Sequence, residues 1–444
     1  MLTALTMPAK AYARRRKQLM DMAGDDAIVI VPSAVERIRS RDTHYPFRQD
    51  SDLSYLTGFP EPEAVLVLVP GRRHGETLLF CRERDAEREA WDGPRFGPEG
   101  AVEAFGLDDA YPIADIDDIL PGLLEGRSRV YYHFGRDVEF DLKLIGWLNR
   151  VRAMVRQGAQ PPHEFLELGH LLDELRLFKD RDELRFMQRA ADISVLAHEA
   201  AMAAARPGLH EYELQAEIEA VFRRHDAESA YGSIVGAGRN ACVLHYRANN
   251  APIRDGELVL IDAGAEYRGY AADITRTFPV NGRFTAEQRA LHDLVGAAQA
   301  AALAQARPGV PYEAGHLAAV ETLTEGLLRL GLLKGKLEKN LAEGHYKRFY
   351  RHKTGHWLGM DVHDVGEYRI DGESRLLEPG MAFTIEPGLY VSADDSTVEP
   401  KWRGIGIRTE DDVVVTKTGC EVLTDRLARS ADEIEALMAR RRAA

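Results

Sequence analysis

Two acidic residues lie at the ends of apolar, strand-like segments, where burial of a lone carboxylate is costly. Asp262 ends the run Leu258–Asp262, and Asp273 opens the next such segment. The residues between them, Gly264–Gly269, predict a hairpin turn that brings both carboxylates to one face. Carboxylates that close repel each other unless a cation lies between them. The alternative is that each carboxylate pairs with a nearby arginine such as Arg276.

More carboxylates and a group of histidines follow downstream. Glu386 and Glu410 each lie in an apolar, glycine-bounded segment that is typical of a strand. Ahead of both, between Asp273 and Glu386, His352, His356 and His363 fall within a short stretch that contains glycine and has little helical pattern. This density favours a functional role over three separate structural histidines.

Together these residues form an oxygen-rich ligand set of four carboxylates and one imidazole. Such a set suits hard or borderline divalent ions, manganese foremost. Four negative charges exceed what one divalent ion neutralises, so we expect two ions about 3.5–4 Å apart, bridged by shared carboxylates. A pair of this kind lowers the pKa of a bridging water and holds it as hydroxide for attack on a carbonyl. The predicted chemistry is metal-assisted hydrolysis.

The elements that position these residues fall into two parts, which differ in their pattern of predicted helices and strands. In the first part, short apolar runs bounded by proline or glycine predict buried strands at 27–31, 64–69 and 77–80. Helical periodicity follows over 140–155, so we expect an α/β N-terminal domain. The basic run Arg14–Lys17 is expected to be the solvated face of a helix.

The second part alternates long amphipathic helices with glycine-punctuated strand pairs. This pattern predicts an α+β domain with an antiparallel sheet. We place the boundary near Glu174, which gives an N-terminal domain of residues 1–174 and a catalytic domain of residues 175–444. Helices are predicted over 182–205, 211–225, 285–306 and 312–331.

Composition excludes several classes of protein. The 444 residues are 45% hydrophobic and carry a net charge of −14, which is typical of a globular chain and unfavourable for nucleic-acid binding. The three cysteines are widely spaced and predict neither a disulfide framework nor a CxxC metal site. No signal-peptide pattern and no membrane-length apolar run is found, so we expect a cytoplasmic protein without a membrane partner.

The predicted ligands resemble a known set. In residue order they are similar to the five ligands of the dinuclear pita-bread metallopeptidases: Asp262, Asp273, His356, Glu386 and Glu410. The residues around each ligand resemble aminopeptidase P of the bacterial type most closely. The likeness extends to Ile234–Asn240, Leu244–Tyr246 and, in the N-terminal part, Phe47–Phe59, so it covers nearly the whole chain.

This resemblance implies a role for each ligand. Asp262 would chelate one ion, Asp273 and Glu410 would bridge both, and His356 with Glu386 would hold the other. Glu386 would also carry a proton from the nucleophilic water to the leaving proline nitrogen. The reaction implied is release of the N-terminal residue from peptides with proline in second position, by attack of a dimetal-bridging hydroxide on the Xaa-Pro bond.

The resemblance also implies residues that contact the substrate. His245 and His363 would orient the peptide and stabilise the tetrahedral intermediate, which makes them catalytic together with Glu386. His352 and Arg408 would line the pocket for the proline ring.

Two aromatic residues complete the substrate pocket that the family implies. Tyr390 would shape the same cleft as His352 and Arg408. Trp91 would reach the cleft from a neighbouring subunit, which implies a homo-oligomer, either a dimer or a tetramer. The alternative is that Trp91 is an ordinary half-buried tryptophan.

Several alternatives stay open from the sequence. Prolidase shares all five ligands but cleaves only dipeptides, whereas a methionine aminopeptidase would leave the N-terminal part and the proline pocket unexplained. A non-catalytic pita-bread binding protein is disfavoured because no ligand is missing. The segment Lys353–Gly355 departs from the family and leaves the substrate preference open, since it adds a positive charge to the pocket.

Overall fold

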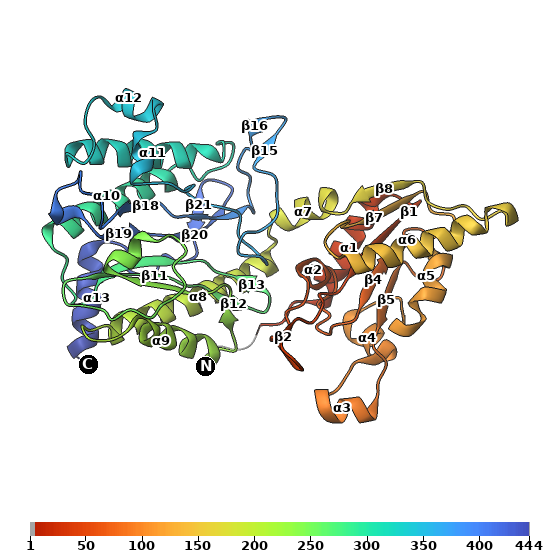
Figure 1. Ribbon diagram of the computed structural model, residues 1–444. Helices are drawn as coiled ribbons and strands as arrows, with labels where there is room; N and C mark the ends of the chain where they lie inside the picture. The colour runs from red at the N-terminus through yellow and green to blue at the C-terminus, as the bar shows by residue number, and fades with distance from the viewer. Residues whose placement is uncertain (1–4, 444) are drawn as a thin grey trace. The chain divides into compact units, whose positions relative to one another are not determined.

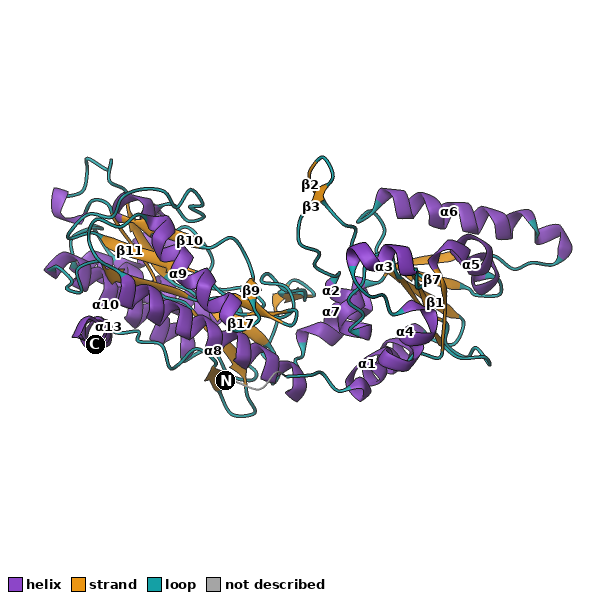
Figure 2. Cartoon of the chain, turned by 90° about the horizontal axis from the view of Figure 1, so that it is seen from below, coloured by secondary structure: helices purple, strands orange, loops and turns teal. Residues whose placement is uncertain are grey.

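The computed structural model describes residues 5–443. The chain folds as two compact units, Met1–Arg176 and Leu177–Ala444. Figure 1 colours them along the chain, and Figure 2 separates helices from strands. Within the described residues, no helix is long and apolar enough to cross a membrane.

The first unit is built on a mixed sheet of six strands, in the order β6-β5-β4-β1-β7-β8. Neighbours β1, β4 and β5 are antiparallel, while β7, β8 and β6 join them in parallel pairs. The strands are β1 (Ala27–Pro32), β4 (Val65–Leu68), β5 (Thr77–Cys81), β6 (Asp109–Pro112), β7 (Arg129–Tyr132) and β8 (Glu164–Glu167). This confirms the α/β class predicted for the N-terminal part.

Helices and a small exposed hairpin complete this unit. The hairpin joins β2 (Ile38–Ser40) to β3 (Thr43–His44). The helices are α1 (Ala9–Ala23), α2 (Ser51–Thr57), α3 (Ala86–Asp92), α4 (Gly97–Phe105), α5 (Ile116–Leu124) and α6 (Val138–Ala153), and α7 (Gly169–Leu177) ends it. The core lies between the sheet and α5 and α6, where Phe140, Trp147 and Tyr132 pack together.

The prediction of a solvated basic face on α1 is wrong for two of its residues. The side chains of Arg15 and Arg16 are buried. They donate to the backbone carbonyls of Tyr55 and Leu56 at the end of α2, at 3.1 and 2.9 Å. Each guanidinium therefore satisfies carbonyl groups that a helix end leaves without partners.

The second unit places antiparallel strands between two pairs of helices (Figures 1 and 2). Helices α8 (Arg181–Ala204) and α9 (Glu211–Arg224) lie on one side, and α10 (Ala286–Leu303) and α11 (Glu313–Arg329) on the other. The shorter helices are α12 (Leu337–Ala342) and α13 (Ala431–Ala443). The four long helices match the four predicted from periodicity.

The strands form small antiparallel sheets, as predicted. One sheet is β10-β11-β14, formed by Ile234–Ala237, Leu258–Asp262 and Thr275–Pro279. A second is β17-β20-β21, formed by Ala382–Ile385, Asp411–Val415 and Cys420–Val422. The pair β18-β19 joins Gly388–Val391 to Ile405–Arg408. Short strands are β9 (Glu228–Ser229), β12 (Ala265–Tyr267), β13 (Tyr270–Ala271), β15 (Arg369–Ile370) and β16 (Glu373–Ser374).

The connection between the two aspartates differs from the predicted turn. The segment contains its own hairpin, β12 and β13, which turns at Arg268 and Gly269, both with positive φ. Strand β14 begins at Thr275, opposite Asp262, so Asp273 precedes the strand and does not open it. Sequence alternation missed this excursion because the residues of β12 and β13 are mostly buried on both faces.

A fully buried ion pair ties the two main sheets together. Arg276 on β14 donates to Asp411 on β20 at 2.7 Å, and both side chains are 0% exposed. The same guanidinium donates to the backbone carbonyls of Glu410 and Ala428, at 2.6 and 2.9 Å. Arg276 therefore pairs with Asp411 and holds the backbone of Glu410.

We predict that Arg276→Met lowers the free energy of unfolding by about 3–5 kcal/mol, because it removes the buried cation closest to Asp411 and leaves only the longer contact with Arg429, at 3.5 Å. Urea denaturation followed by circular dichroism measures the change. The matched control is Arg254→Met, which breaks the exposed pair with Glu257 and should change stability by less than about 0.5 kcal/mol. Equal effects of the two variants would contradict a special role for the buried pair.

Candidate metal centre

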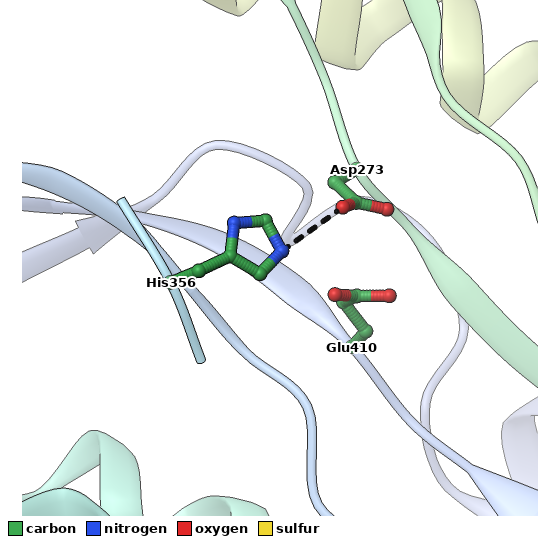
Figure 3. A group of neighbouring side chains, drawn as sticks. All are labelled: Asp273, His356 and Glu410. Carbon is green, nitrogen blue, oxygen red and sulfur yellow. Dashed lines mark ion pairs between the residues drawn. The ribbon is translucent and has the colours of Figure 1, made fainter. Parts of the chain in front are cut away.

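Three of the predicted ligands form a compact group (Figure 3). One ligand atom from each of Asp273, His356 and Glu410 lies within 4.8 Å of the other two. His356 Nε2 is 3.3 Å from Asp273 Oδ2, the contact drawn as a dashed line in Figure 3. Asp273 and Glu410 are buried, at 5% and 2% exposure, while His356 is partly exposed.

The other two predicted ligands adjoin this group. Asp262 and Asp273 both accept a hydrogen bond from the Tyr231 hydroxyl, at 2.6 and 2.5 Å. Glu386 Oε1 lies 3.9 Å from His356 Nε2. The structure thus brings together all five residues that the sequence singled out as ligands.

Close backbone packing sets the position of His356. A Cβ atom on Gly355 would lie 1.9 Å from the carbonyl oxygen of Thr384, so only glycine fits beside strand β17. The His356 carbonyl then accepts the Thr384 N–H at 2.9 Å. The ring is oriented by a bond between His356 Nδ1 and the carbonyl of Trp357, at 2.9 Å, which leaves Nε2 toward the carboxylates.

Strand ends hold the carboxylates. Asp262 ends β11, Glu386 follows β17, and Glu410 lies between β19 and β20. Thr275 fixes Glu410 twice, because its carbonyl accepts the Glu410 N–H at 3.1 Å and its hydroxyl donates to Glu410 Oε2 at 2.6 Å. These contacts join β14 to β20 at the point where the carboxylates meet.

The electrostatics of the five ligand residues favour the binding of cations. Burial raises the pKa of Glu386 to about 7, with Asp273 and Asp262 adding to the shift and His356 and Arg408 opposing it. Burial and the neighbouring carboxylates also raise the pKa of Glu410 well above its usual range. Against the cost of its burial, the hydrogen bond and charge of Asp273 raise the pKa of His356 to about 9.

Crowded carboxylates of this kind resist ionisation until positive charge is placed between them. The donor set of four carboxylates and one imidazole matches the oxygen and nitrogen ligands that divalent ions such as manganese prefer. The residues present therefore fit a divalent metal site.

A second group of residues lies beside the ligands and forms a directed chain of hydrogen bonds. Arg408 donates to Asp262 at 2.6 Å and to the Tyr390 oxygen at 2.9 Å. The Tyr390 hydroxyl then donates to His352 Nε2 at 2.9 Å, and His352 Nδ1 donates to the carbonyl of Lys353 at 2.7 Å. Burial and the charge of Arg408 lower the pKa of His352 to about 3, so the ring is neutral.

A cavity of about 890 Å³ opens onto the ligand group. All five ligands line it, together with Arg408 and four further histidines: His245, His316, His352 and His363. The ring of His363 contacts that of His356, with centroids 4.3 Å apart. Tyr390 is buried behind this wall and reaches the cavity through Arg408 and His352.

Trp91 lies in the first unit, on α3, and is 84% exposed. It is therefore not a half-buried core tryptophan. Its predicted role at the pocket of a neighbouring subunit remains a prediction.

Some contributors were missed by the sequence analysis. Tyr231 bridges Asp262 and Asp273, yet it stands in the chain far before both and follows no ligand pattern. Asp412 accepts the Asp273 N–H through both carboxylate oxygens, at 3.2 Å each. The run Glu410–Asp412 indicated the role of Asp412, since three consecutive buried positions rarely carry three acidic residues.

Pairing with arginine does not account for both aspartates, Asp262 and Asp273. Arg276 pairs with Asp411, so it does not neutralise Asp262 or Asp273. Arg408 does pair with Asp262, at 2.6 Å, but among the described residues no arginine or lysine pairs with Asp273, Glu386 or Glu410, and the imidazole of His356 lies beside Asp273 and Glu386.

Comparison with known proteins follows the same two-part division. The profile of "Metallopeptidase family M24" matches residues 185–417, and that of "Aminopeptidase P, N-terminal domain" matches residues 12–131. The Xaa-Pro aminopeptidase of Escherichia coli (strain K12) is 44% identical over 429 residues, covering 96% of this chain and 97% of that protein.

Solved structures agree over the whole length. The aminopeptidase PepP of Pseudomonas aeruginosa superposes with a TM-score of 0.98 at 57% identity, covering 99% of both chains. Aminopeptidase P from E. coli, solved with the inhibitor Pro-Leu, gives a TM-score of 0.95 at 43% identity and covers 99% of this chain and all of its own. The chain therefore belongs to metallopeptidase family M24 and carries the N-terminal domain of aminopeptidase P ahead of its metallopeptidase domain.

Proposed function

We propose that this enzyme is a metal-dependent Xaa-Pro aminopeptidase, which releases the N-terminal residue from peptides with proline in second position. The observation that carries the proposal is the gathering of five ligand residues at the wall of one cavity. The relatives of similar length named as Xaa-Pro aminopeptidases support this substrate class.

Two divalent ions fit this ligand set, and we propose manganese for both. Asp262 would hold one ion, Asp273 and Glu410 would bridge the two, and His356 and Glu386 would hold the other. When bound, the ions supply Lewis acidity, polarising the scissile carbonyl and lowering the pKa of an attacking water.

The residues of the chain carry the proton and steer the peptide. Glu386 is the group we propose as proton shuttle, because its carboxylate lies beside the other ligands on the cavity wall, within reach of a metal-bound water. His363 and His245 line the cavity beside the ligands and would donate hydrogen bonds to the developing oxyanion.

The proline ring has to be recognised by shape, because its nitrogen carries no hydrogen once it is in a peptide bond. We propose that His352, Tyr390 and Arg408 form this pocket. Their hydrogen-bond chain fixes all three side chains relative to Asp262. A preformed wall of this kind costs little conformational entropy when substrate binds.

Three further features belong to the same proposal. The domain of residues 1–174 would mediate a homo-oligomer, dimer or tetramer, and present Trp91 to the pocket of a neighbouring subunit. The catalytic domain would be residues 175–444. The protein would act in the cytoplasm on small peptides.

We predict that Glu410→Ala and Asp273→Ala each abolish activity, to below about 1% of the parent, together with metal binding, because both would bridge the ions. Metal content is measured by mass spectrometry after refilling with manganese. Circular dichroism checks that the fold persists. The matched control is Glu421→Ala, an exposed carboxylate on β21, which should bind metal like the parent. Either site variant keeping most of its turnover would refute the assignment.

His363→Ala should lower kcat by about 10²–10³-fold, the usual effect of losing one donor to an oxyanion, while stoichiometric metal is retained. Steady-state kinetics beside metal analysis separates the two effects. Loss of metal in this variant would show instead that His363 is a ligand.

Substrate length separates the proposal from prolidase, which shares the ligands. We expect manganese-dependent cleavage of an Xaa-Pro-Xaa tripeptide with little cleavage of the matching Xaa-Pro dipeptide, because the cavity of about 890 Å³ has room beyond the proline. Chromatography of the products measures both rates. Cleavage of the dipeptide alone would make the enzyme a prolidase.

A further inference from the structure

A polar cluster lines the same cavity outside the proposed catalytic residues. It consists of His316 on α11 and of Lys353 and Thr354, in the segment that leads to His356. The Thr354 hydroxyl bonds to His316 Nδ1 at 2.8 Å and to the Tyr350 hydroxyl at 2.6 Å. Tyr350 is buried and packs edge-on against His352, with ring centroids 4.8 Å apart. The cluster thus adjoins the proposed proline pocket.

The available donors and acceptors determine the direction of the hydrogen bonds from Tyr350 through Thr354 to His316. The Tyr350 hydroxyl has Thr354 as its one hydrogen-bond partner among residues 5–443, so its buried O–H must donate there. The Thr354 hydroxyl then has its own hydrogen left to give, and the available acceptor is His316 Nδ1. A neutral imidazole that accepts at Nδ1 carries its hydrogen on Nε2.

The His316 ring is neutral, and positive charge surrounds it. Burial, followed by the charges of Lys353 and Lys347, lowers the pKa of His316 to about 4. Neither lysine has a carboxylate within 4 Å among the described residues. Outside the five ligands, the one carboxylate on the cavity wall is Glu313, which is paired with Arg369 at 2.9 Å. His316 Nε2 has no hydrogen-bond partner in the described part of the chain.

We propose that His316 Nε2–H and the ammonium group of Lys353 form an anion subsite, which binds a carboxylate of the peptide substrate. The inference rests on the proposed peptidase function and adds a substrate class to it, peptides with a suitably placed carboxylate. An N–H donor combined with an ammonium group is the usual way to hold such an anion.

Distance along the chain agrees with this role. Lys353 stands three positions before His356, so their Cα atoms are at most about 11 Å apart. An extended peptide advances about 3.3 Å per residue. A carboxylate two or three residues from the scissile bond therefore lies within the same range, before the reach of the lysine side chain is added.

The carboxylate could belong to an acidic side chain or to the peptide C-terminus, and three matched peptide pairs distinguish these sources. Ala-Pro-Ala is compared with its C-terminal amide. Glu-Pro-Ala amide is compared with Gln-Pro-Ala amide, and Ala-Pro-Glu amide with Ala-Pro-Gln amide. For each pair, kcat and KM are measured on the manganese-loaded enzyme and give the preference for the carboxylate.

We expect the parent to prefer the carboxylate in at least one pair. His316→Leu and Lys353→Met should each reduce that preference about three- to tenfold, through KM more than kcat, because a partly exposed charge contact is weakened. Thr354→Val should reduce the preference less. Valine cannot donate to His316 Nδ1, so the ring hydrogen is no longer held on Nε2, but the ring and Lys353 both remain. The matched control is Lys339→Met, a lysine of α12 outside the cavity wall, which should keep the preference of the parent.

An unchanged preference in both His316→Leu and Lys353→Met would overturn the subsite while leaving the peptidase function standing. If the parent cleaves none of the peptides with manganese bound, the proposed function fails. Calorimetric binding of the same peptides then decides on the subsite. A carboxylate preference that Lys353→Met removes would support it, and equal binding of acid and amide would overturn it.

Discussion

Mutual repulsion between buried carboxylates is the constraint on which the second unit depends. Asp262, Asp273, Glu386 and Glu410 converge from four separate strand ends or connections, and burial raises the pKa of Asp262, Glu386 and Glu410. A cation held between such carboxylates offsets this repulsion. The antiparallel sheets, the close approach at Gly355 and the paired contacts of Thr275 all act to keep these groups together against that repulsion.

A second layer of charge stands behind the first. Arg276 and Asp411 are completely buried, and the same guanidinium holds the Glu410 carbonyl. Gln299 on α10 donates to Asp411 at 2.8 Å, and the Thr424 hydroxyl bonds to the same carboxylate. The ligand-bearing connection between β19 and β20 is thereby tied to a helix and to a second sheet. Positioning of Glu410 is a property of the whole unit, because no local turn could fix it.

The sequence was sufficient to predict both fold classes, the four long helices and the residues that gather at the cavity. Periodicity predicted the helices because each buries one face, and carboxylates inside apolar runs are rare enough to indicate a site. Contacts between distant segments could not be predicted in this way. Tyr231 reaches Asp262 and Asp273 from a loop with no pattern, and Arg15 and Arg16 are buried by α2, which no local signal announces.

The hairpin β12–β13 shows a different limit of prediction from the sequence. Its residues are buried on most faces, so the two-residue alternation that identifies a half-exposed strand is absent. The sequence therefore predicts a turn where the structure has a short hairpin. The site itself was unaffected, because Asp262 and Asp273 are brought together by Tyr231 and the start of β14 whichever path lies between them.

The direction of the hydrogen bonds from Arg408 through Tyr390 to His352 has a consequence for proton transfer at Glu386. His352 Nδ1 lies 3.5 Å from Glu386 Oε2, close enough for an imidazole to compete for any proton that this carboxylate takes up. Both ring nitrogens are already committed, however, since Nε2 accepts from Tyr390 and Nδ1 donates to Lys353. The ring of His352 is therefore not a proton acceptor for Glu386, although it lies beside that carboxylate.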